Sequence, residues 1–282
     1  MINRSIVLFG ATSMLGYQLA TKFPRAIHPF ISPGNRAQAV RHWPSLQLDS
    51  SNWIEELFHR TQPNVLLYCH AVCDVTKCET HPEWADEINI QHVKRVVRAL
   101  PEHAKFVYVS SDHVFGGDGV YTEDSAPCPI SVYGRTRVDA EHEVLQRAGS
   151  LVIRTGLGIG ASHNGRTGHH DWLRYRMQQQ LPITIIEDEY RSAVWTHELA
   201  QRVMDLAKSA ETGIRHLCAT RAVSRIELAT HLLKGMGREA TFTVESRHQQ
   251  RTPHIGRVEL RTVYQGPLFS PLPSVLEKRI SF

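Results

Sequence analysis

The segment "VLFGATSMLGYQL" (residues 7–19) joins a short apolar run, a turn with two glycines and the start of a helix. In dinucleotide-binding loops the first glycine makes the tight turn, the middle position admits a pyrophosphate, and the last glycine lets helix and strand pack closely. The helix N-terminus attracts the phosphates through its free N–H groups and its dipole. The segment therefore predicts such a loop; a glycine C-cap and turn in a plain α/β protein is the alternative. The predicted cofactor contacts here are Gly10, Thr12, Ser13, Met14, Leu15 and Gly16.

Apolar and helical segments alternate along the first half of the chain. Apolar, strand-like runs occupy residues 5–10, 25–31, 64–71, 104–111 and 150–159, and "LQLD" forms a short further strand that ends at Asp49. Helical spacing of apolar residues occurs at 13–23, 51–61, 82–100 and from Tyr133 onward. Strands that are apolar throughout and alternate with helices indicate a parallel sheet covered on both faces. The prediction is an α/β fold with a doubly wound parallel sheet, a Rossmann domain.

Beyond Gly160 this rhythm weakens. The polar segment "ASHNGRTGHHDW" (161–172) is expected as a mobile loop at the ligand edge of the sheet, and its histidines, His163, His169 and His170, as solvated loop residues. Helices are expected at 198–210, 224–237 and 273–280, with short strands at 213–219 and 240–245. We expect a dinucleotide-binding domain over residues 1–160, to which a segment near 190–211 returns. Residues 161–189 and 212–282 would form a smaller α/β substrate-binding lobe.

Composition excludes several classes of protein. The 282 residues are 41% hydrophobic and 21% charged, and the net charge of +4 comes from scattered Lys and Arg, with no basic run of the kind that binds nucleic acid or a membrane surface. No apolar stretch approaches the roughly 20 residues that cross a bilayer, and the N-terminus does not resemble a signal peptide. Five cysteines show no disulfide pattern. We expect a reduced, cytoplasmic protein; the oligomeric state is open, with a homodimer as the commonest assembly.

Cys69, His70, Cys73 and Cys78 lie close together in "YCHAVCDVTKC" (68–78). Their spacing fits no common zinc signature, since a structural zinc site needs four well-spaced ligands. The segment also begins on an apolar strand, where cysteine behaves as a small hydrophobic residue. We expect no metal site.

The segment after the second strand bears on the choice of cofactor. "SPGNRAQ" (32–38) contains no acidic residue to bind a ribose 2′-hydroxyl, whereas Ser32, Asn35 and Arg36 would suit a 2′-phosphate. NADPH is therefore favoured and NADH stays open, because Arg36 is equally interpretable as a solvated loop cation. Asp49 is placed to reach the adenine or to cap the helix that follows. Ser50, His70, Ala71, Tyr133 and Arg137 complete the predicted cofactor contacts.

"SVYGRTRVDAE" (131–141) places Tyr133 and Arg137 on one helical face, because residues four apart on a helix are neighbours. A phenol with a pKa near 10 deprotonates readily at neutral pH only beside a cation, and Arg137 would supply that cation. Ser110 and Ser111 end an apolar strand in "VYVSSDHVFGG" (107–117), where doubly wound folds bind ligands. The pattern predicts a site that reduces a carbonyl. The alternative is that Tyr133 and Arg137 only pack against neighbours or face solvent, without a catalytic role.

Together, "FGATSMLG" (9–16), "VSSDHVFGG" (109–117), "YGRTRVDAE" (133–141) and "LVIRTGLGIG" (151–160) resemble the extended short-chain dehydrogenase/reductase superfamily. Within it, the chain most resembles the dTDP-4-dehydrorhamnose reductase family. "AVCDVTKCETHPEWADEINI" (71–90) is similar to the segment after that family's fourth strand, and "VWTHELAQRV" (194–203) and "GIRHLCA" (213–219) are similar to parts of its substrate lobe.

The resemblance implies roles for particular residues. Tyr133 would be the proton donor and Ser111 the catalytic hydroxyl, with Asn89 in the supporting network of the active site. Gly10, Ser13 and Gly16 would lie under the pyrophosphate. Hydride would pass from the nicotinamide to a 4-keto carbon while Tyr133 protonates the oxygen and Ser111 hydrogen-bonds it.

Two positions depart from the family pattern. Arg137 stands where the family has Lys, and His113 where it usually has Tyr. Arginine keeps the charge and can bind a vicinal diol with two N–H groups, but it is bulkier and cannot release a proton into a relay. The sequence therefore predicts that cofactor binding is retained and that the chemistry is slower.

Three functions follow from the resemblance. The first is an NADPH-dependent reductase of a nucleotide-activated 4-keto-6-deoxysugar, with Ser111, Asp112, His113, Arg166, Arg191 and Trp195 as candidate substrate contacts and "GRTGHHDW" (165–172) closing over the sugar. The second is a cofactor-binding regulatory protein without catalysis, as in the regulatory subunit of methionine adenosyltransferase, which resembles the same family. The third, an epimerase or dehydratase, is less favoured because such relatives are longer and dehydratases need a further acid/base pair.

Overall fold

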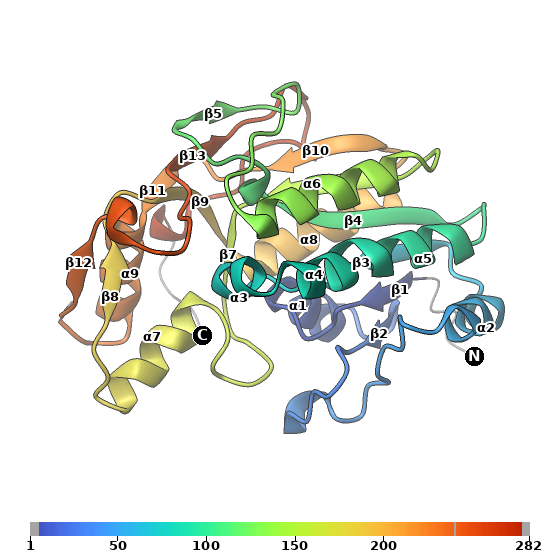
Figure 1. Ribbon diagram of the computed structural model, residues 1–282, viewed down its shortest axis with the longest axis horizontal. Coiled ribbons are helices and arrows are strands. Elements are labelled where there is room, and N and C mark those ends of the chain that lie inside the picture. Colours follow the sequence, from blue (N-terminus) through green and yellow to red (C-terminus); the bar gives the residue numbers. More distant parts are fainter. Residues whose placement is uncertain (1–5, 240, 278–282) are drawn as a thin grey trace.

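The computed structural model describes residues 6–239 and 241–277 of the chain. Its largest sheet has six parallel strands (Figure 1). In spatial order they are β10 (Gly213–Leu217), β6 (Leu151–Thr155), β4 (Lys105–Ser111), β3 (Val65–Tyr68), β1 (Ile6–Phe9) and β2 (Ile27–Phe30). β1 is buried along its whole length and pairs with both neighbours, Ile6 lying opposite Ile27 and Val65. Strands buried on both faces read as continuous apolar runs, which is why the sequence predicted them correctly.

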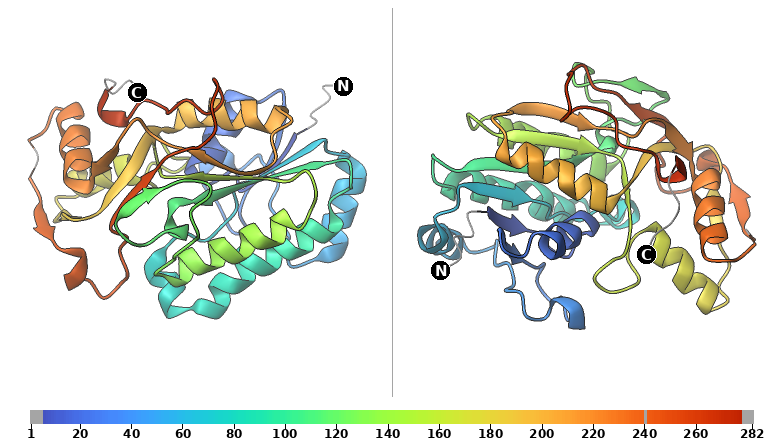
Figure 2. Two further views of the ribbon diagram at one scale, coloured as in Figure 1. Left: turned by 90° about the horizontal axis from the view of Figure 1, so that it is seen from above. Right: turned by 180° about the vertical axis from the view of Figure 1, so that it is seen from behind.

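Helices cover both faces of this sheet (Figure 2). Their apolar residues form one core with each face, the first including Leu19 and Met204 and the second Leu57 and Val144. α1 (Met14–Lys22) and α8 (Thr196–Lys208) pack on one face, and α2 (Ser51–Thr61), α5 (His92–Ala99) and α6 (Val132–Leu145) on the other. The prediction of a doubly wound α/β fold is confirmed. α5 is preceded by α3 (Val75–Thr80), α4 (Pro82–Asp86) and a π-helical turn (Glu87–Gln91), so the predicted helix 82–100 is one helical stretch interrupted by that turn.

A second group of elements packs beside the carboxyl ends of the large sheet (Figure 1). Its main sheet contains β11 (Ala222–Ser224), β9 (Tyr190–Trp195), β13 (Arg257–Leu260) and β5 (Gly119–Tyr121), with β7 (Leu157–Ile159) paired to β9. A smaller ladder joins β8 (Thr184–Ile186) to β12 (Thr243–Glu245). α7 (His169–Gln178) and α9 (Arg225–Gly235) pack against these strands through a third apolar core. Single 3-10 turns lie at Gln38–Val40, Asp112–Val114, Arg247–Gln249 and Val275–Glu277.

Three sequence expectations about the fold are corrected. β10, which was expected in the smaller lobe, is the edge strand of the large sheet, because its register pairs Gly213 with Leu151 of β6. "LQLD" (46–49) is not a strand; only an isolated bridge between Ile31 and Ser45 stands in its place. The helix expected at 273–280 is a 3-10 turn at Val275–Glu277, and residues 278–280 lie outside the described part. The strand expected at 240–245 is β12, which begins at Thr243; residue 240 lies outside the described residues.

The topology determines where a ligand can bind. The strand order reverses between β1 and β3, and doubly wound sheets bind ligands at the carboxyl ends of the strands beside such a reversal. The glycine loop after β1, the His70 segment after β3 and Ser111 at the end of β4 all lie at this edge. Within the described residues every helix falls short of the length and apolarity that a membrane span requires.

Candidate active site

The loop after β1 has the geometry that its two glycines predict. Gly10 adopts a left-handed conformation with φ +83°, and its N–H donates to the carbonyl of Phe30 across 3.1 Å. A Cβ at Gly10 would lie 2.4 Å from the backbone nitrogen of His70, and one at Gly16 would lie 2.2 Å from the carbonyl oxygen of Gly10. Both positions therefore require glycine for close packing, and Gly10 requires it for its left-handed conformation as well.

Gly10→Ala is expected to destabilise the fold by about 1–3 kcal/mol, because it adds a steric conflict with His70 to the strain of a left-handed residue. Gly34→Ala is a matched control. Gly34 has φ +74°, but no other group lies within 4 Å of the place that a Cβ would take, so only the conformational cost, about 1 kcal/mol, should be measured. Urea unfolding measures both changes. Equal losses in the two variants would show that close packing against His70 does not matter.

Ser13 caps the first helix. Its Oγ accepts a hydrogen bond from the N–H of Gly16 at 3.0 Å, and the hydroxyl proton is left to donate to a ligand. Met14 and Leu15 form the first turn of α1, whose N-terminus suits an anion. Thr12 donates to the hydroxyl of Ser32 at 3.1 Å and so connects the glycine loop to the end of β2.

The segment after β2 lies next to the loop after β3. Ser32 Oγ is 3.3 Å from Nδ1 of His70, and burial lowers the pKa of His70 to about 4, so its ring is neutral at neutral pH. Ala71 follows, partly buried. Arg36 is exposed in the loop that begins at Ser32, and no acidic residue occurs between residues 32 and 38.

Asp49 and Ser50 lie at the start of α2. Ser50 is the N-cap, its Oγ accepting from the N–H of Trp53 at 3.3 Å, so the alternative in which Asp49 caps this helix is wrong. The Asp49 carboxylate instead lies 2.9 Å from Nε2 of His92, and this hydrogen bond lowers its pKa. Its side chain is 82% exposed and accessible to a ligand from solvent.

Tyr133 and Arg137 lie in the first turns of α6, which Ser131 caps by accepting from the N–H of Gly134. Both side chains are buried, and the Arg137 guanidinium lies 6.0 Å from the centroid of the Tyr133 ring. The same guanidinium stacks on Tyr108 at 4.6 Å and donates through Nη2 to the carbonyl of Val109. Its Nε and Nη1 are buried with no hydrogen-bond partner among the described residues. Buried donors rarely remain unpaired in a native protein, so these two atoms are suited to a hydroxyl-rich ligand.

The expectation that Arg137 makes the phenol easy to deprotonate is wrong. Burial raises the pKa of Tyr133 above its ordinary value, and Arg137 and hydrogen bonding with Ser111 offset only part of that rise. The spacing of residues along a helix reveals a neighbouring cation, but it does not reveal how far the phenol is buried away from water. Here burial has the larger effect on the pKa of Tyr133. The Tyr133 hydroxyl is therefore protonated at neutral pH, which is the state that a proton donor needs.

Ser111 and Asn89 surround this pair. Ser111 ends β4, and its Oγ accepts from the N–H of His113 at 3.2 Å. Asn89 is fully buried, and its amide bonds both backbone groups of Val72 and the hydroxyl of Thr136 on α6, at 2.9 to 3.1 Å. Asn89 thus holds the loop after β3 against the helix that carries Tyr133.

Two of the candidate substrate residues bind each other instead. Asp112 is fully buried and forms a two-point ion pair with Arg191 of β9, with Arg191 Nε 2.8 Å from Oδ2. This pair connects the end of β4 to the second sheet. Trp195 is only 4% exposed and belongs to the third apolar core, so the expectation that it contacts substrate is wrong. His113 stacks edge-on against Tyr133 at 5.2 Å, and burial lowers its pKa to about 4, so it is a neutral wall of the site.

The charges around Glu189 were not foreseen from any motif. This buried carboxylate lies 3.5 Å from Nε of Arg225 and 3.0 Å from Nδ1 of His254. Burial alone would raise the pKa of Glu189, but Arg225, His254 and Arg191 together hold it well below its ordinary value. Arg225 in turn lies 2.6 Å from Nε2 of His169. These residues are up to 85 positions apart in the chain, so no local pattern could have revealed them.

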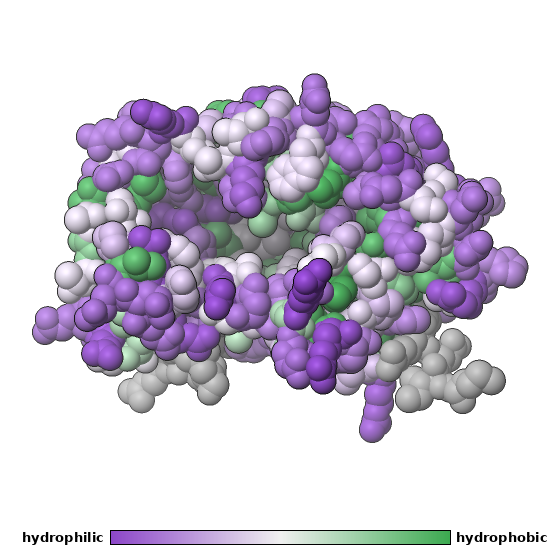
Figure 3. Space-filling model, turned by 60° about the horizontal axis from the view of Figure 1, so that its bottom comes forward, coloured by the Kyte–Doolittle hydropathy of each residue, from purple (hydrophilic) through white to green (hydrophobic). Residues whose placement is uncertain are grey.

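A cavity of about 800 Å³ opens between the loop after β3 and the second group of elements. Arg166, His169, Arg225 and His254 supply its basic groups, and Cys73 and Asp74 come from the loop after β3. The apolar part of the wall consists of Trp172, Leu173, Ile185, Ile186, Leu228, Ala229 and Leu232. Figure 3 shows one face of the molecule hollowed near its centre, with hydrophilic residues along much of the rim.

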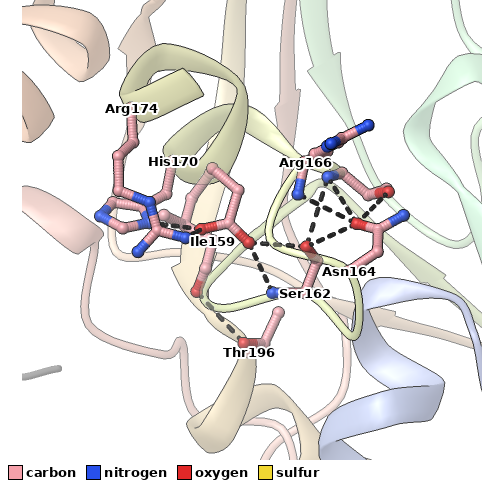
Figure 4. Close-up of polar contacts among 9 residues, drawn as sticks. Ile159, Ser162, Asn164, Arg166, His170, Arg174 and Thr196 are labelled. Atoms are coloured by element: carbon pink, nitrogen blue, oxygen red, sulfur yellow. Dashed lines mark hydrogen bonds and ion pairs between the residues drawn. The ribbon is translucent and has the colours of Figure 1, made fainter. Parts of the chain in front are cut away.

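The segment 161–168 is an ordered loop with its own hydrogen bonds (Figure 4). The Asp171 carboxylate accepts from the N–H and the hydroxyl of Ser162, and the Asn164 side-chain oxygen accepts from the N–H groups of Arg166 and Thr167. His163 and His170 are buried, so the expectation of solvated histidines is wrong for both. Arg166, at the tip, is exposed and lies over the ring of Tyr175.

No cysteine takes part in a potential metal site within the described residues. The one grouping of three potential ligands found there is Asp49, Glu87 and His92, whose ligand atoms lie within 4.8 Å of one another. Their atoms already have partners, since His92 bonds Asp49 and Arg95 donates to Glu87 at 2.6 Å.

A glycine loop opening α1, a buried Tyr133 with a cation one helical turn later, and a hydroxyl at the end of β4 define a member of the extended short-chain dehydrogenase/reductase superfamily. More narrowly, the chain belongs to the family described as the RmlD substrate binding domain, whose family model matches residues 4–257.

Known proteins similar to this chain differ in what they do. A methionine adenosyltransferase 2 subunit beta from Pongo abelii is 30% identical over 161 residues, which are 56% of this chain and 48% of that protein, so the match spans about half of that relative. A Haloferax volcanii protein named "Probable low-salt glycan biosynthesis reductase Agl14" is 23% identical over 245 residues, 84% of this chain and 82% of that one. The Bacillus anthracis dTDP-4-dehydrorhamnose reductase in complex with NADP has a TM-score of 0.81 at 21% identity, covering 95% of this chain and 94% of that one.

Proposed function

We propose that the protein is an NADPH-dependent reductase of a nucleotide-activated 4-keto-6-deoxysugar. The observation that carries this proposal is the buried phenol of Tyr133, which lies beside Ser111 at the same sheet edge as the glycine loop. Family membership and the fold shared with a dTDP-4-dehydrorhamnose reductase support it. The name of the Haloferax volcanii relative, a glycan biosynthesis reductase, agrees with a sugar substrate.

The residues present fit a dinucleotide. Gly10 and Gly16 allow the close backbone packing that brings the N-terminus of α1, which suits a pyrophosphate, to the end of β1. The two unpaired donors of Arg137 suit the hydroxyls of the nicotinamide ribose. The bound cofactor supplies the hydride that adds to the keto carbon. Tyr133 donates the proton to the carbonyl oxygen, and the Ser111 hydroxyl hydrogen-bonds that oxygen as its negative charge develops. Arg137 remains charged throughout, so it cannot reprotonate the Tyr133 phenolate with its own proton.

NADPH is favoured over NADH at the adenosine end. A carboxylate there would bind a ribose 2′-hydroxyl and repel a 2′-phosphate, but Ser32, Asn35 and the exposed Arg36 occupy the segment after β2. Solved structures that share this fold hold NADP in one case and NAD in others, so the preference for NADPH rests on the segment after β2.

The cavity between the two groups of elements supports a nucleotide-linked substrate. Arg166 and Arg225 line it and can bind phosphate oxygens, because guanidinium groups pair with phosphate through two N–H donors. The apolar wall that includes Trp172 and Leu228 suits a nucleobase, and Cys73 lies on the side nearer Tyr133, among the groups that influence the phenol. Homodimer formation, a cytoplasmic location and the lack of nucleic-acid or membrane partners remain predictions.

The direct test follows the ultraviolet absorbance of NADPH after addition of a dTDP-4-keto-6-deoxysugar to the purified protein. Loss of absorbance that depends on both components, with formation of the 4-hydroxy sugar, is the expected result. Cofactor that co-purifies and is not consumed, with the sugar isomerised, would indicate the epimerase alternative instead.

The pH dependence of kcat tests the state of Tyr133. Because burial raises the pKa of this phenol, the proton donor stays protonated beyond the range in which an unperturbed tyrosine begins to ionise. We expect kcat with saturating substrates to stay level up to about pH 10, where an unperturbed phenol with a pKa near 10 is already half ionised. A fall of kcat to half its value by about pH 10 would contradict a raised pKa.

The second candidate is a cofactor-binding regulatory protein without turnover. Two observations favour it: the methionine adenosyltransferase 2 subunit beta of Pongo abelii is similar to part of this chain, and Arg137 replaces a family lysine. This candidate predicts tight NADPH binding with no consumption of 4-keto sugar, in the unmodified protein and in Arg137→Lys alike. Turnover by the unmodified protein excludes it.

A further inference from the structure

His163 is a buried histidine that packs against residues bordering the glycine loop. It belongs to the loop between β7 and α7 and is only 8% exposed. Its ring lies edge-on to Tyr17 of α1, with centroids 6.2 Å apart, and its Nε2 lies 2.9 Å from Nδ2 of Asn35. His163 thus contacts two elements that border the glycine loop, although it is 128 residues from Asn35 in the chain.

The contacts of Asn35 determine which nitrogen of His163 carries the proton. Asn35 Oδ1 accepts from the N–H of Ala37 at 3.0 Å, so its amide nitrogen faces His163 and donates to Nε2. Burial lowers the pKa of His163, and the nearby backbone of Thr12 offsets only part of that fall. The ring is therefore neutral at neutral pH, and its single proton is on Nδ1.

The backbone of Thr12 in the glycine loop lies within reach of the His163 ring, and Nδ1 is the nitrogen that faces it, because Nε2 faces Asn35. This nitrogen is nevertheless buried and makes no hydrogen bond of normal geometry with the described residues. A buried N–H that is so poorly paired is suited to a stronger acceptor, and the oxygens of a phosphate are among the strongest available.

The loop that carries His163 is held against the N-terminus of α1. Asp171 and Asn164 fix its backbone by the hydrogen bonds drawn in Figure 4. At its far end Gly168 has φ +81° and packs so closely that a Cβ there would lie 2.8 Å from Sδ of Met14. The loop passes over the first turn of α1, where a pyrophosphate would bind in the proposed function.

We propose that His163 is a cofactor-binding residue whose Nδ1–H donates to a pyrophosphate oxygen, with Asn35 as the positioning residue that fixes its tautomer. The proposal rests on the proposed function, since it needs a dinucleotide at the glycine loop. It adds a contact from the second group of elements to a site otherwise built by β1, α1 and β2. The loop 161–168 then encloses the dinucleotide between His163 and the helix N-terminus.

Isothermal titration with two cofactor fragments tests this contact. ADP-ribose 2′-phosphate contains the pyrophosphate, and adenosine 2′-phosphate lacks it. His163→Phe keeps a ring beside Tyr17 but has no donor, and we expect it to raise the Kd for ADP-ribose 2′-phosphate about tenfold or more, as for loss of a hydrogen bond to a charged group. Its Kd for adenosine 2′-phosphate should change less than about twofold. Asn35→Ala should weaken binding of both fragments, because Asn35 is also a candidate contact of the 2′-phosphate, but it should weaken the fragment with the pyrophosphate more.

His59→Ala, on the exposed face of α2, is the matched control and should alter neither Kd. An unchanged Kd for ADP-ribose 2′-phosphate in His163→Phe, with normal binding by the unmodified protein, overturns the inference and leaves the proposed function standing. If His163→Phe raises the Kd for both fragments equally, His163 acts on the adenosine part of the cofactor, and the proposed contact with the pyrophosphate is wrong. If the unmodified protein binds neither fragment nor NADPH, the proposed function fails as well.

Discussion

Tyr133→Phe is expected to lower kcat for reduction of a 4-keto sugar by about 10²- to 10⁴-fold, the usual contribution of a positioned general acid. Phenylalanine keeps the ring that packs edge-on against His113 but removes the hydroxyl that is protonated in this buried site. The Kd for NADPH should change little, because the donors of Arg137 and the glycine loop remain. Single-turnover kinetics and a separate NADPH titration measure the two effects.

Tyr108→Phe is the matched control for this variant. Tyr108 is also buried and lies even nearer the Arg137 guanidinium, at 4.6 Å, but it lies on the central strand β4 and its hydroxyl has no partner among the described residues. We expect kcat to stay within a few-fold of the original. A similar loss in both variants would mean that any phenol near Arg137 matters through packing or charge, and the assignment of Tyr133 as proton donor would be wrong.

Glu141→Ala is expected to cost about 3–5 kcal/mol of unfolding free energy, because it leaves a buried arginine without its counter-charge. Glu141 on α6 and Arg154 on β6 are almost completely buried, and Arg154 reaches the carboxylate through Nε and Nη2, the latter at 2.6 Å. The hydroxyl of Ser110 donates to the same carboxylate. This pair connects the helix that carries Tyr133 to the sheet.

Glu143→Ala provides the comparison on the same helix. Glu143 lies 3.4 Å from Nζ of Lys94, but both side chains are partly exposed, so the loss should be about 0–1 kcal/mol. Urea unfolding followed by far-ultraviolet circular dichroism measures both. If the two variants unfold at the same denaturant concentration, burial of the Glu141–Arg154 pair contributes nothing to stability.

Structural features that depend on residues close together in the chain were predictable from the sequence. The alternation of apolar strands and helices indicated the doubly wound sheet, because strands of a covered parallel sheet are apolar on both faces. The glycine loop and the placement of Tyr133 one turn before Arg137 also depend on neighbours within a few residues. The family resemblance rested on the same local motifs, and the match over residues 4–257 agrees with it.

Features that depend on distant residues were missed or misjudged. Asp112 and Arg191 were expected as substrate contacts and instead form an ion pair across 79 positions of sequence. β10 was expected in the smaller lobe, but edge pairing with β6 is decided by register between strands far apart in the chain. His163 was expected in solvent and is buried against Tyr17 and Asn35.

The sequence alone determined the class of fold, the position of the nucleotide loop and the identity of the phenol–guanidinium pair, because each is encoded in periodicity and spacing along one segment. The tertiary structure alone decided which charges pair, which polar groups lose their water and in which direction the pKa of Tyr133 moves. The physical reason is that burial and ion pairing depend on atoms from every element that packs around a group, and most of those atoms belong to residues remote in the chain.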